Sequence, residues 1–217
     1  MKKITFLTLL LSLLISGLYA QNLEVVGKAK ITVMDTVTDV SANVVRQTDG
    51  TLALRHYKIG DMTQGGIVFY IDESGEHGLV SDIVDLASPG NTADSTHQWS
   101  TVYEDTGASG DGIGAGAMNT LLIVSAQRGD TDSAARLCAD LVRGGYGDWY
   151  LPSKEELNLM YNNLKVAGLG GFSSTFYYWS STEVDSSDAW LQSFANGLQE
   201  DGLVKDSAVR VRAVRAF

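Results

Sequence analysis

The stretch that most constrains the fold is GGYGDWYLPSKEEL, residues 144–157. Ser153, followed three residues later by Glu156, forms a capping box: the hydroxyl accepts a hydrogen bond from the Glu156 amide, and the carboxylate accepts one from the Ser153 amide. A helix is therefore predicted to begin at Ser153, with Glu155 and Glu156 in its first turn, where the helix dipole favours anions. Apolar residues follow at the spacing of a buried helix face: Leu157, Met160, Tyr161 and Leu164.

Two further helices are predicted before this stretch, the first over residues 117–127. The second lies within DTDSAARLCADLVR, residues 130–143. Gly144 and Gly145 would end this helix, as a C-terminal glycine does. The only cysteine of the chain, Cys138, excludes an intrachain disulfide. Its place on an apolar face favours a buried small hydrophobic residue over a reactive thiol. The residues expected on that face are Ala134, Leu137, Cys138, Leu141 and Val142.

The rest of the main domain has the composition of strands and loops, so the fold class is α+β. Ile67–Ile71 and Leu79–Val84 flank a polar turn and predict a hairpin. Residues 87–112, which carry Trp99 and Tyr103, are expected to form a long surface loop. Three later strands are predicted from β-branched and aromatic content, over residues 176–183, 188–197 and 207–217.

The last predicted strand alternates apolar residues with arginines. The alternation slips at Ala213-Val214, which indicates a β-bulge. Its arginines could bind an anionic ligand, but a solvated strand face is the favoured interpretation. They are Arg210, Arg212 and Arg215.

The N-terminal end has the features of a secretory signal peptide over residues 1–20: Lys2 and Lys3, a short apolar run and Ala20 at the expected cleavage site. We therefore expect an exported protein, extracellular or on the outer cell surface, with the periplasm as a possibility. Residues 21–60 predict a β-rich stalk with a hairpin at Asp49-Gly50. A main domain over 61–217 would follow.

Charge and motif content exclude several function classes. Loss of the signal peptide would remove two lysines and no acids, leaving a formal net charge of −12, which opposes nucleic-acid and anionic-membrane binding. No membrane insertion is expected. The three histidines are too far apart for a zinc site, and no G-x-S-x-G motif is present. No cofactor is expected: DSSD (185–188) and QEDG (199–202) could hold a weak calcium ion, although solvated turns are favoured.

Aromatic residues near the C-terminus are the strongest candidates for recognition. Tyr177, Tyr178, Trp179 and Trp190 lie among serine, aspartate and asparagine residues. Exposed aromatic rings beside short polar side chains form effective binding surfaces. For the two tryptophans, packing in the core is the favoured interpretation.

Several ordered motifs resemble the Lcl C-terminal domain family of bacterial surface and adhesin modules. They are GGIVFYID, LCADLVRGGYGDWYLPSKEEL, YYWSSTE, AWLQSFANG and VRVRAVR, spread from Gly65 to Phe217. The resemblance implies a C-type-lectin-like fold, with two helices flanking a mixed sheet and a ligand-binding face on the last strands and their loops. The N-terminal segment is similar to stalks of surface and tail-fibre-like proteins, which implies a possible homotrimer.

The chain departs from the family pattern in two ways. Members often pair a cysteine on the helix with one near the end; the corresponding positions are Cys138 and Ala213, so the disulfide is lost and the two side chains are expected to be neighbours. The calcium-site motifs of sugar-binding C-type lectins are also missing, which argues against calcium-dependent sugar binding. The named member of the family is associated with sulfated glycosaminoglycans, and the acidic net charge of this chain argues against the same ligand here.

The C-terminal region also resembles the variable ends of lectin-fold proteins diversified by retroelements. That resemblance implies a set of exposed polar and aromatic positions as the ligand-binding residues. They are Tyr177, Ser186, Ser187, Asp188, Gln192, Ser193, Asn196, Gln199, Glu200 and Asp201.

The leading hypothesis is a secreted or surface-displayed, non-enzymatic module that binds an extracellular glycan or protein. One alternative is an enzyme or accessory protein similar to formylglycine-generating enzymes, which share a related fold. These need active cysteines or copper ligands, and a lone Cys138 on a buried face speaks against them. The other alternative is a structural fibre or surface-layer component.

Overall fold

The computed structural model describes residues 44–46, 52–54, 57–87, 95–127 and 129–217, all within the compact unit Ser41–Phe217. Strands β1 (Val44–Arg46) and β2 (Leu52–Leu54) pair antiparallel, with Val45 opposite Ala53. This pairing confirms the predicted hairpin, whose Asp49-Gly50 turn lies outside the described residues. The predicted signal peptide and the rest of the stalk, except residues 57–60, also lie outside them.

A four-stranded antiparallel sheet contains the first predicted hairpin of the main domain. That hairpin is confirmed, but its second strand ends at Ser81 rather than Val84. The Asp82 carboxylate accepts hydrogen bonds from the Ile83 and Val84 amides, which turns the chain out of the sheet. The strands, in sheet order, are β11 (Val214–Ala216), β5 (Gly78–Ser81), β4 (Gly66–Ile71) and β3 (Met62–Thr63).

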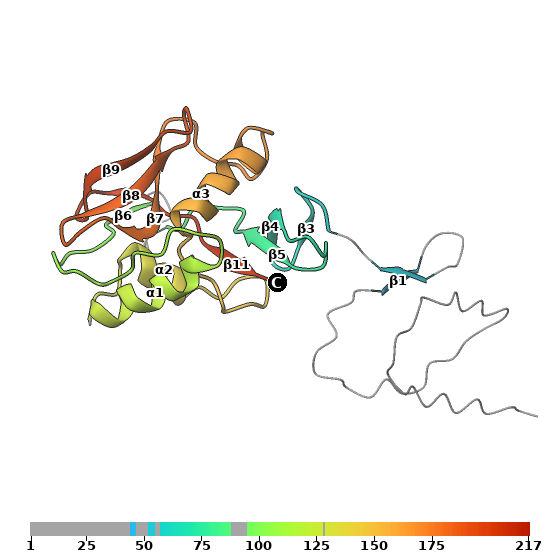
Figure 1. Ribbon diagram of the computed structural model, residues 1–217, viewed down its shortest axis with the longest axis horizontal. Helices are drawn as coiled ribbons and strands as arrows, with labels where there is room; N and C mark the ends of the chain where they lie inside the picture. The colour runs from blue at the N-terminus through green and yellow to red at the C-terminus, as the bar shows by residue number, and fades with distance from the viewer. Residues whose placement is uncertain (1–43, 47–51, 55–56, 88–94, 128) are drawn as a thin grey trace, which may run out of the picture. The chain divides into compact units, whose positions relative to one another are not determined.

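The second sheet has five strands. Figure 1 shows β6, β7, β8 and β9 of this sheet lying together. β10 pairs parallel with β7, and the other neighbours pair antiparallel. The QEDG segment, predicted to be a solvated turn, is instead the start of the edge strand β9. In sheet order the strands are β6 (Thr96–His97), β10 (Val209–Arg210), β7 (Tyr177–Glu183), β8 (Asp188–Ser193) and β9 (Gln199–Val204).

The predicted single strand over residues 207–217 is wrong, because the chain leaves one sheet and enters the other. β10 belongs to the five-stranded sheet and β11 to the four-stranded sheet. Between them, the carbonyls of Val211 and Ala213 accept amides of Leu86 and Asp82 instead of ladder partners. A crossing between sheets, rather than a bulge, therefore explains the slip in alternation.

The helices are α1 (Ala115–Ala126), α2 (Ala134–Ala139) and α3 (Lys154–Met160), and α3 continues as the π-helical turn η1 (Tyr161–Lys165). α1 packs against α2 and β7, whereas α3 packs against β4, β7 and β8. The structure is therefore α+β, as predicted.

The end of α2 was predicted wrongly. The helix stops at Ala139, so Val142 lies beyond it and is 78% exposed. Gly144 and Gly145 do not end the helix; both have positive φ, in a turn closed by reciprocal backbone bonds between Arg143 and Tyr146. Only glycine fits at position 144, since a Cβ there would lie 2.7 Å from the Gly65 Cα.

The capping box at the start of α3 is confirmed. Ser153 Oγ accepts the Glu156 amide at 3.3 Å, and the Glu156 carboxylate accepts the Ser153 amide at 2.8 Å. Glu156 is fully buried, where it also accepts the Gly114 amide and the Tyr150 hydroxyl, and burial raises its pKa. The two adjacent glutamates therefore have different environments. Glu155 is exposed, whereas Glu156 links the N-terminal ends of α1 and α3.

The core consists of two clusters of buried side chains. Cys138 and Ala213, which were predicted to be neighbours, are both fully buried in the first cluster. The predicted surface loop is only partly at the surface, since Trp99 is fully buried and donates its indole N–H to the Ser180 carbonyl. Tyr103, by contrast, is 51% exposed.

Replacing Ser153 with alanine should lower the free energy of unfolding by ~1–2 kcal/mol, because it removes the side-chain cap of α3. Ser153 Oγ also donates to the Gly112 carbonyl, which places the expected value in the upper half of that range. Chemical denaturation of the variant would measure the change. Ser186→Ala, at an exposed turn position, is the matched control and should have almost no effect.

Candidate ligand-binding groove

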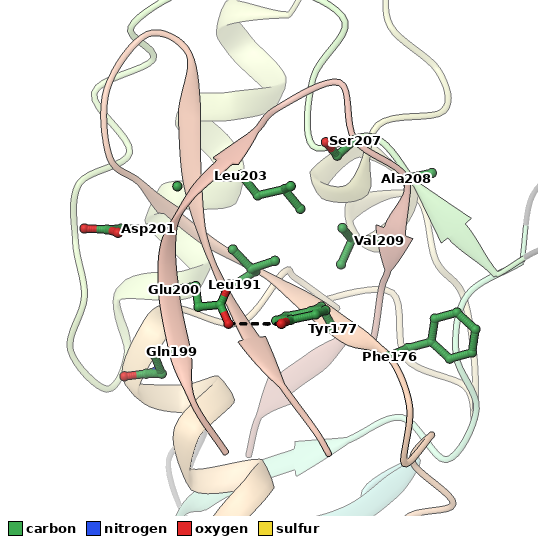
Figure 2. A pocket seen from close by; sticks show the side chains of 11 residues that line it. Phe176, Tyr177, Leu191, Gln199, Glu200, Asp201, Leu203, Ser207, Ala208 and Val209 are labelled. Carbon is green, nitrogen blue, oxygen red and sulfur yellow. Dashed lines mark hydrogen bonds between the residues drawn. The ribbon is translucent and has the colours of Figure 1, made fainter. Parts of the chain in front are cut away.

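A groove with a volume of about 650 Å³ lies over one face of the five-stranded sheet, between β9 and the segment that leads into β10 (Figure 2). Leu191, Leu203 and Val209 supply apolar surface at its base. Phe176 and Tyr177, 44% and 37% exposed, lie at the β7 end. The lining residues are Phe176, Tyr177, Leu191, Gln199, Glu200, Asp201, Gly202, Leu203, Ser207, Ala208 and Val209.

Strand alternation determines which side chains face the groove. Figure 2 shows Tyr177 and Glu200 facing each other, whereas Gln199 and Asp201 project from the opposite side of β9. The Tyr177 hydroxyl donates to Glu200 Oε1 at 3.0 Å, and this hydrogen bond raises the pKa of Tyr177. The next residue, Tyr178, faces the core, where burial raises its pKa to about 12.

The charge of the groove is negative. Among the described residues, Glu200 and Asp201 are the only charged ones that line it. Arg210 stacks on the Phe176 ring, 4.4 Å from its centroid, but its guanidinium is paired with Asp85 at 2.6 Å. The groove therefore combines apolar and aromatic surface with uncompensated carboxylate charge.

Four of the ten predicted ligand-binding residues line this groove: Tyr177, Gln199, Glu200 and Asp201. The structure separates the other six from it. Gln192 and Ser193 are buried rather than exposed, and the Gln192 amide nitrogen donates to Asn158 Oδ1 and the Gly197 carbonyl. These two residues stabilise the β8–β9 turn and offer no surface to a ligand.

The remaining four predicted residues lie at or beside the two ends of β8. Ser186 and Ser187 belong to the β7–β8 connection and Asp188 begins β8, and Asp185 accepts the amides of Ser187 and Asp188. The Ser187 amide in particular lowers the pKa of Asp185. Asn196 accepts the Leu198 amide. Within the part of the chain that the structure describes, no group of three acidic, histidine or cysteine side chains could hold a metal ion.

Sequence reasoning missed most of the apolar surface of the groove. Leu191 and Val209 lie on predicted strands but were not assigned to a binding surface, and the strand that carries Leu203 was not predicted. Phe176 carried a usable signal, as the aromatic first residue of the predicted strand over residues 176–183. Because β9 was not predicted, however, the sequence did not indicate a second side of a groove opposite Phe176.

The two tryptophans predicted to be buried have different environments. Trp179 is fully buried and donates its indole N–H to the His97 carbonyl. Trp190 is only partly buried, and the Lys154 ammonium lies 3.3 Å from its ring centroid. The core prediction is therefore confirmed for Trp179 and wrong for Trp190.

The predicted solvated arginine face is also wrong. Arg212 and Arg215 are 1% and 7% exposed. Arg212 pairs with Asp85, and Arg215 pairs with Asp148, whose pKa the guanidinium lowers. Because these guanidinium groups already have internal partners, they do not form an anion site.

Among the residues that the structure describes, no helix is long and apolar enough to cross a membrane. A crystal structure of a fimbrial protein from Bacteroides ovatus ATCC 8483 is similar, with 14% sequence identity and a TM-score of 0.48. The match covers 81% of this chain and 48% of that one, so this chain spans about half the length of the fimbrial protein. No curated protein matches this chain in sequence.

The sequence family gives a firmer result. The model of the Lcl C-terminal domain matches residues 91–215. This segment contains α1, α2, α3 and every strand of the five-stranded sheet, and therefore the whole groove. Because the match extends over more than half of the chain, this protein belongs to the Lcl C-terminal domain family.

Proposed function

We propose that this protein is an exported, surface-displayed module for ligand binding or adhesion, without enzymatic activity. Its ligand face is the groove between β7, β9 and Ser207–Val209. The observation that carries the proposal is the combination in one hollow of two exposed aromatic rings, an apolar base and polar side chains. Membership of a family of surface modules supports the same role.

The groove has the properties of a recognition site. Its volume falls within the range of ~300–1,000 Å³ that is typical of ligand pockets. Folding leaves Tyr177 and Phe176 substantially exposed, although burying large aromatic rings stabilises a protein. Exposed aromatic residues in a hollow are the side chains that contribute most to binding energy at interfaces.

No observation favours the formylglycine-generating-enzyme alternative. Cys138, the only cysteine in the chain, is fully buried, and burial raises its pKa well above its usual range. A thiol with a raised pKa, out of contact with solvent, is a poor nucleophile and a poor metal ligand. The C-type-lectin-like fold and the homotrimer remain proposals that accompany the binding role.

Tyr177→Ala should weaken ligand binding by about tenfold or more, because an exposed aromatic side chain that lines a groove contributes strongly to affinity. The measurement is a screen of the exported chain against arrays of glycans and extracellular proteins, followed by titration of any ligand with both forms. Tyr103→Ala removes an equally large exposed ring that does not line the groove and serves as the control. Equal affinities of the two variants would contradict the proposed ligand face.

A further inference from the structure

Glu200 has hydrogen-bonding capacity that the fold leaves unused. The half-buried carboxylate faces into the groove, and Oε1 accepts the Tyr177 hydroxyl. Its second oxygen accepts no hydrogen bond from the described residues. A carboxylate has roughly four acceptor sites, so Glu200 retains most of its capacity to bind a donor.

The surroundings of Glu200 leave its negative charge unbalanced. Two cationic side chains of the same sheet region are already paired: Arg210, which stacks on Phe176, with Asp85, and the buried Lys205 with Glu183. Neither residue lines the groove. An anionic ligand would therefore meet the Glu200 carboxylate without a compensating cation among the described residues that line the groove, whereas a cationic ligand would find charge complementarity.

The shape of the groove adds a second requirement. Beside the carboxylate lie the Tyr177 ring and the apolar side chains of Leu191, Leu203 and Val209. Long cationic side chains bury their methylene stems along apolar surface, and their charged ends interact favourably with aromatic rings and carboxylates. Lysine and arginine have this combination of an apolar stem and a cationic end.

From this arrangement we infer that the groove captures a lysine or arginine side chain displayed by a partner protein. The inference rests on the proposed function and specifies the ligand of the same groove. The cationic end bonds Glu200 and lies against Tyr177, and the stem covers the apolar base. The ligand class is thus a basic protein surface rather than a sulfated or neutral glycan.

The direct test is a titration of the isotopically labelled exported chain with Nα-acetylarginine amide, followed by amide chemical shifts. Nα-acetylcitrulline amide, which has nearly the same shape without the charge, is the matched probe. A single residue should bind with a dissociation constant on the order of millimolar. We expect shifts at Tyr177, Glu200 and Leu203 with the arginine probe, and at least about tenfold weaker binding of the citrulline probe.

Two variants separate a specific contact from the general acidity of the face. Glu200→Gln keeps the shape of the side chain and should abolish the preference for arginine over citrulline. Asp201→Asn removes the same charge from the adjacent residue, whose side chain points away, and should retain that preference. Thermal unfolding of both variants checks that each is folded.

Three outcomes would overturn the inference: equal binding of the two probes, equal effects of the two variants, or no shift with the arginine probe. A neutral glycan whose binding requires Tyr177 but tolerates Glu200→Gln would also overturn it. That last result would leave the proposed function intact. Ligand binding that is unchanged by Tyr177→Ala would instead contradict both this inference and the proposed ligand face.

Discussion

Lys205→Met is expected to lower the free energy of unfolding by about 3–5 kcal/mol, because breaking a buried ion pair leaves an uncompensated charge. The Lys205 side chain is 1% exposed and the Glu183 side chain 3% exposed. The ammonium lies 2.5 Å from Glu183 Oε1, donates to the Glu104 carbonyl and faces the Trp99 ring at 4.7 Å. Methionine keeps the length of the side chain but strands the carboxylate in the interior.

The pair also holds the long connection that precedes α1 against the sheet. Glu183 accepts hydrogen bonds from the Thr106 amide and hydroxyl and from the Gly107 amide. Local opening should therefore accompany the loss of stability, and hydrogen exchange at Thr106 and Gly107 should accelerate. Chemical denaturation measures the global effect, and exchange measured by NMR reports the local one.

A double-mutant cycle is the control for this prediction. Removing both charges with Lys205→Met and Glu183→Gln should cost less than the sum of the two single changes, because no isolated charge remains buried. A Lys205→Met variant within about 1 kcal/mol of the parent would show that solvent reaches the carboxylate and that the pair is not isolated from water.

Arg212→Met should have an effect of similar size, about 3–5 kcal/mol, for the same physical reason. The Arg212 side chain is 1% exposed, and its guanidinium lies 2.5 Å from Asp85 Oδ1. It also donates to the carbonyls of Asp82 and Gly170 and lies 4.2 Å from the centroid of the Phe172 ring. One side chain therefore joins the crossing between the two sheets to two other segments, residues 82–85 and 170–172.

Arg210→Met is the matched control, because Arg210 pairs with the same carboxylate but is 23% exposed. After that change Asp85 keeps Arg212, so the expected cost is only about 1 kcal/mol. Thermal or chemical unfolding of the two variants measures the difference. If the two variants lose the same free energy of unfolding, burial of the guanidinium does not determine how much each arginine contributes to stability.

Arg212 and Lys205 also show why charged positions are hard to interpret from sequence. Alternation along residues 207–217 predicted a solvated arginine face, which is the usual outcome for charged residues on a strand. Their partners, Asp85 and Glu183, are 127 and 22 residues away in sequence. When a charged side chain is buried by pairing with such a distant residue, the local sequence pattern does not indicate the burial.

The edge strand β9 was missed for a related reason. QEDG has the composition of a turn, and its residues become a strand only because β8 supplies the hydrogen-bonding partners. Without β9, the set implied by the resemblance to diversified lectin-fold proteins included four residues that line the groove, but also Gln192 and Ser193, which are buried. Composition alone could not distinguish the two faces of these strands.

The sequence by itself determined the features that depend on neighbours along the chain. These are the capping box at Ser153, the hairpin of β4 and β5 and the burial of Cys138 on a helix face. They follow from hydrogen bonds and periodicities within a few residues, which any sequence displays directly. The same motifs were specific enough to identify the family.

Only the tertiary structure decided which C-terminal residues form the groove and which charges are buried. The pairing of β8 with β9 turns Glu200 toward Tyr177 and leaves Asp201 outside. The crossing from β10 to β11 encloses Arg212 with Asp85. Both depend on contacts between distant segments, and a shift of one residue in strand register would reverse which side chains face the ligand.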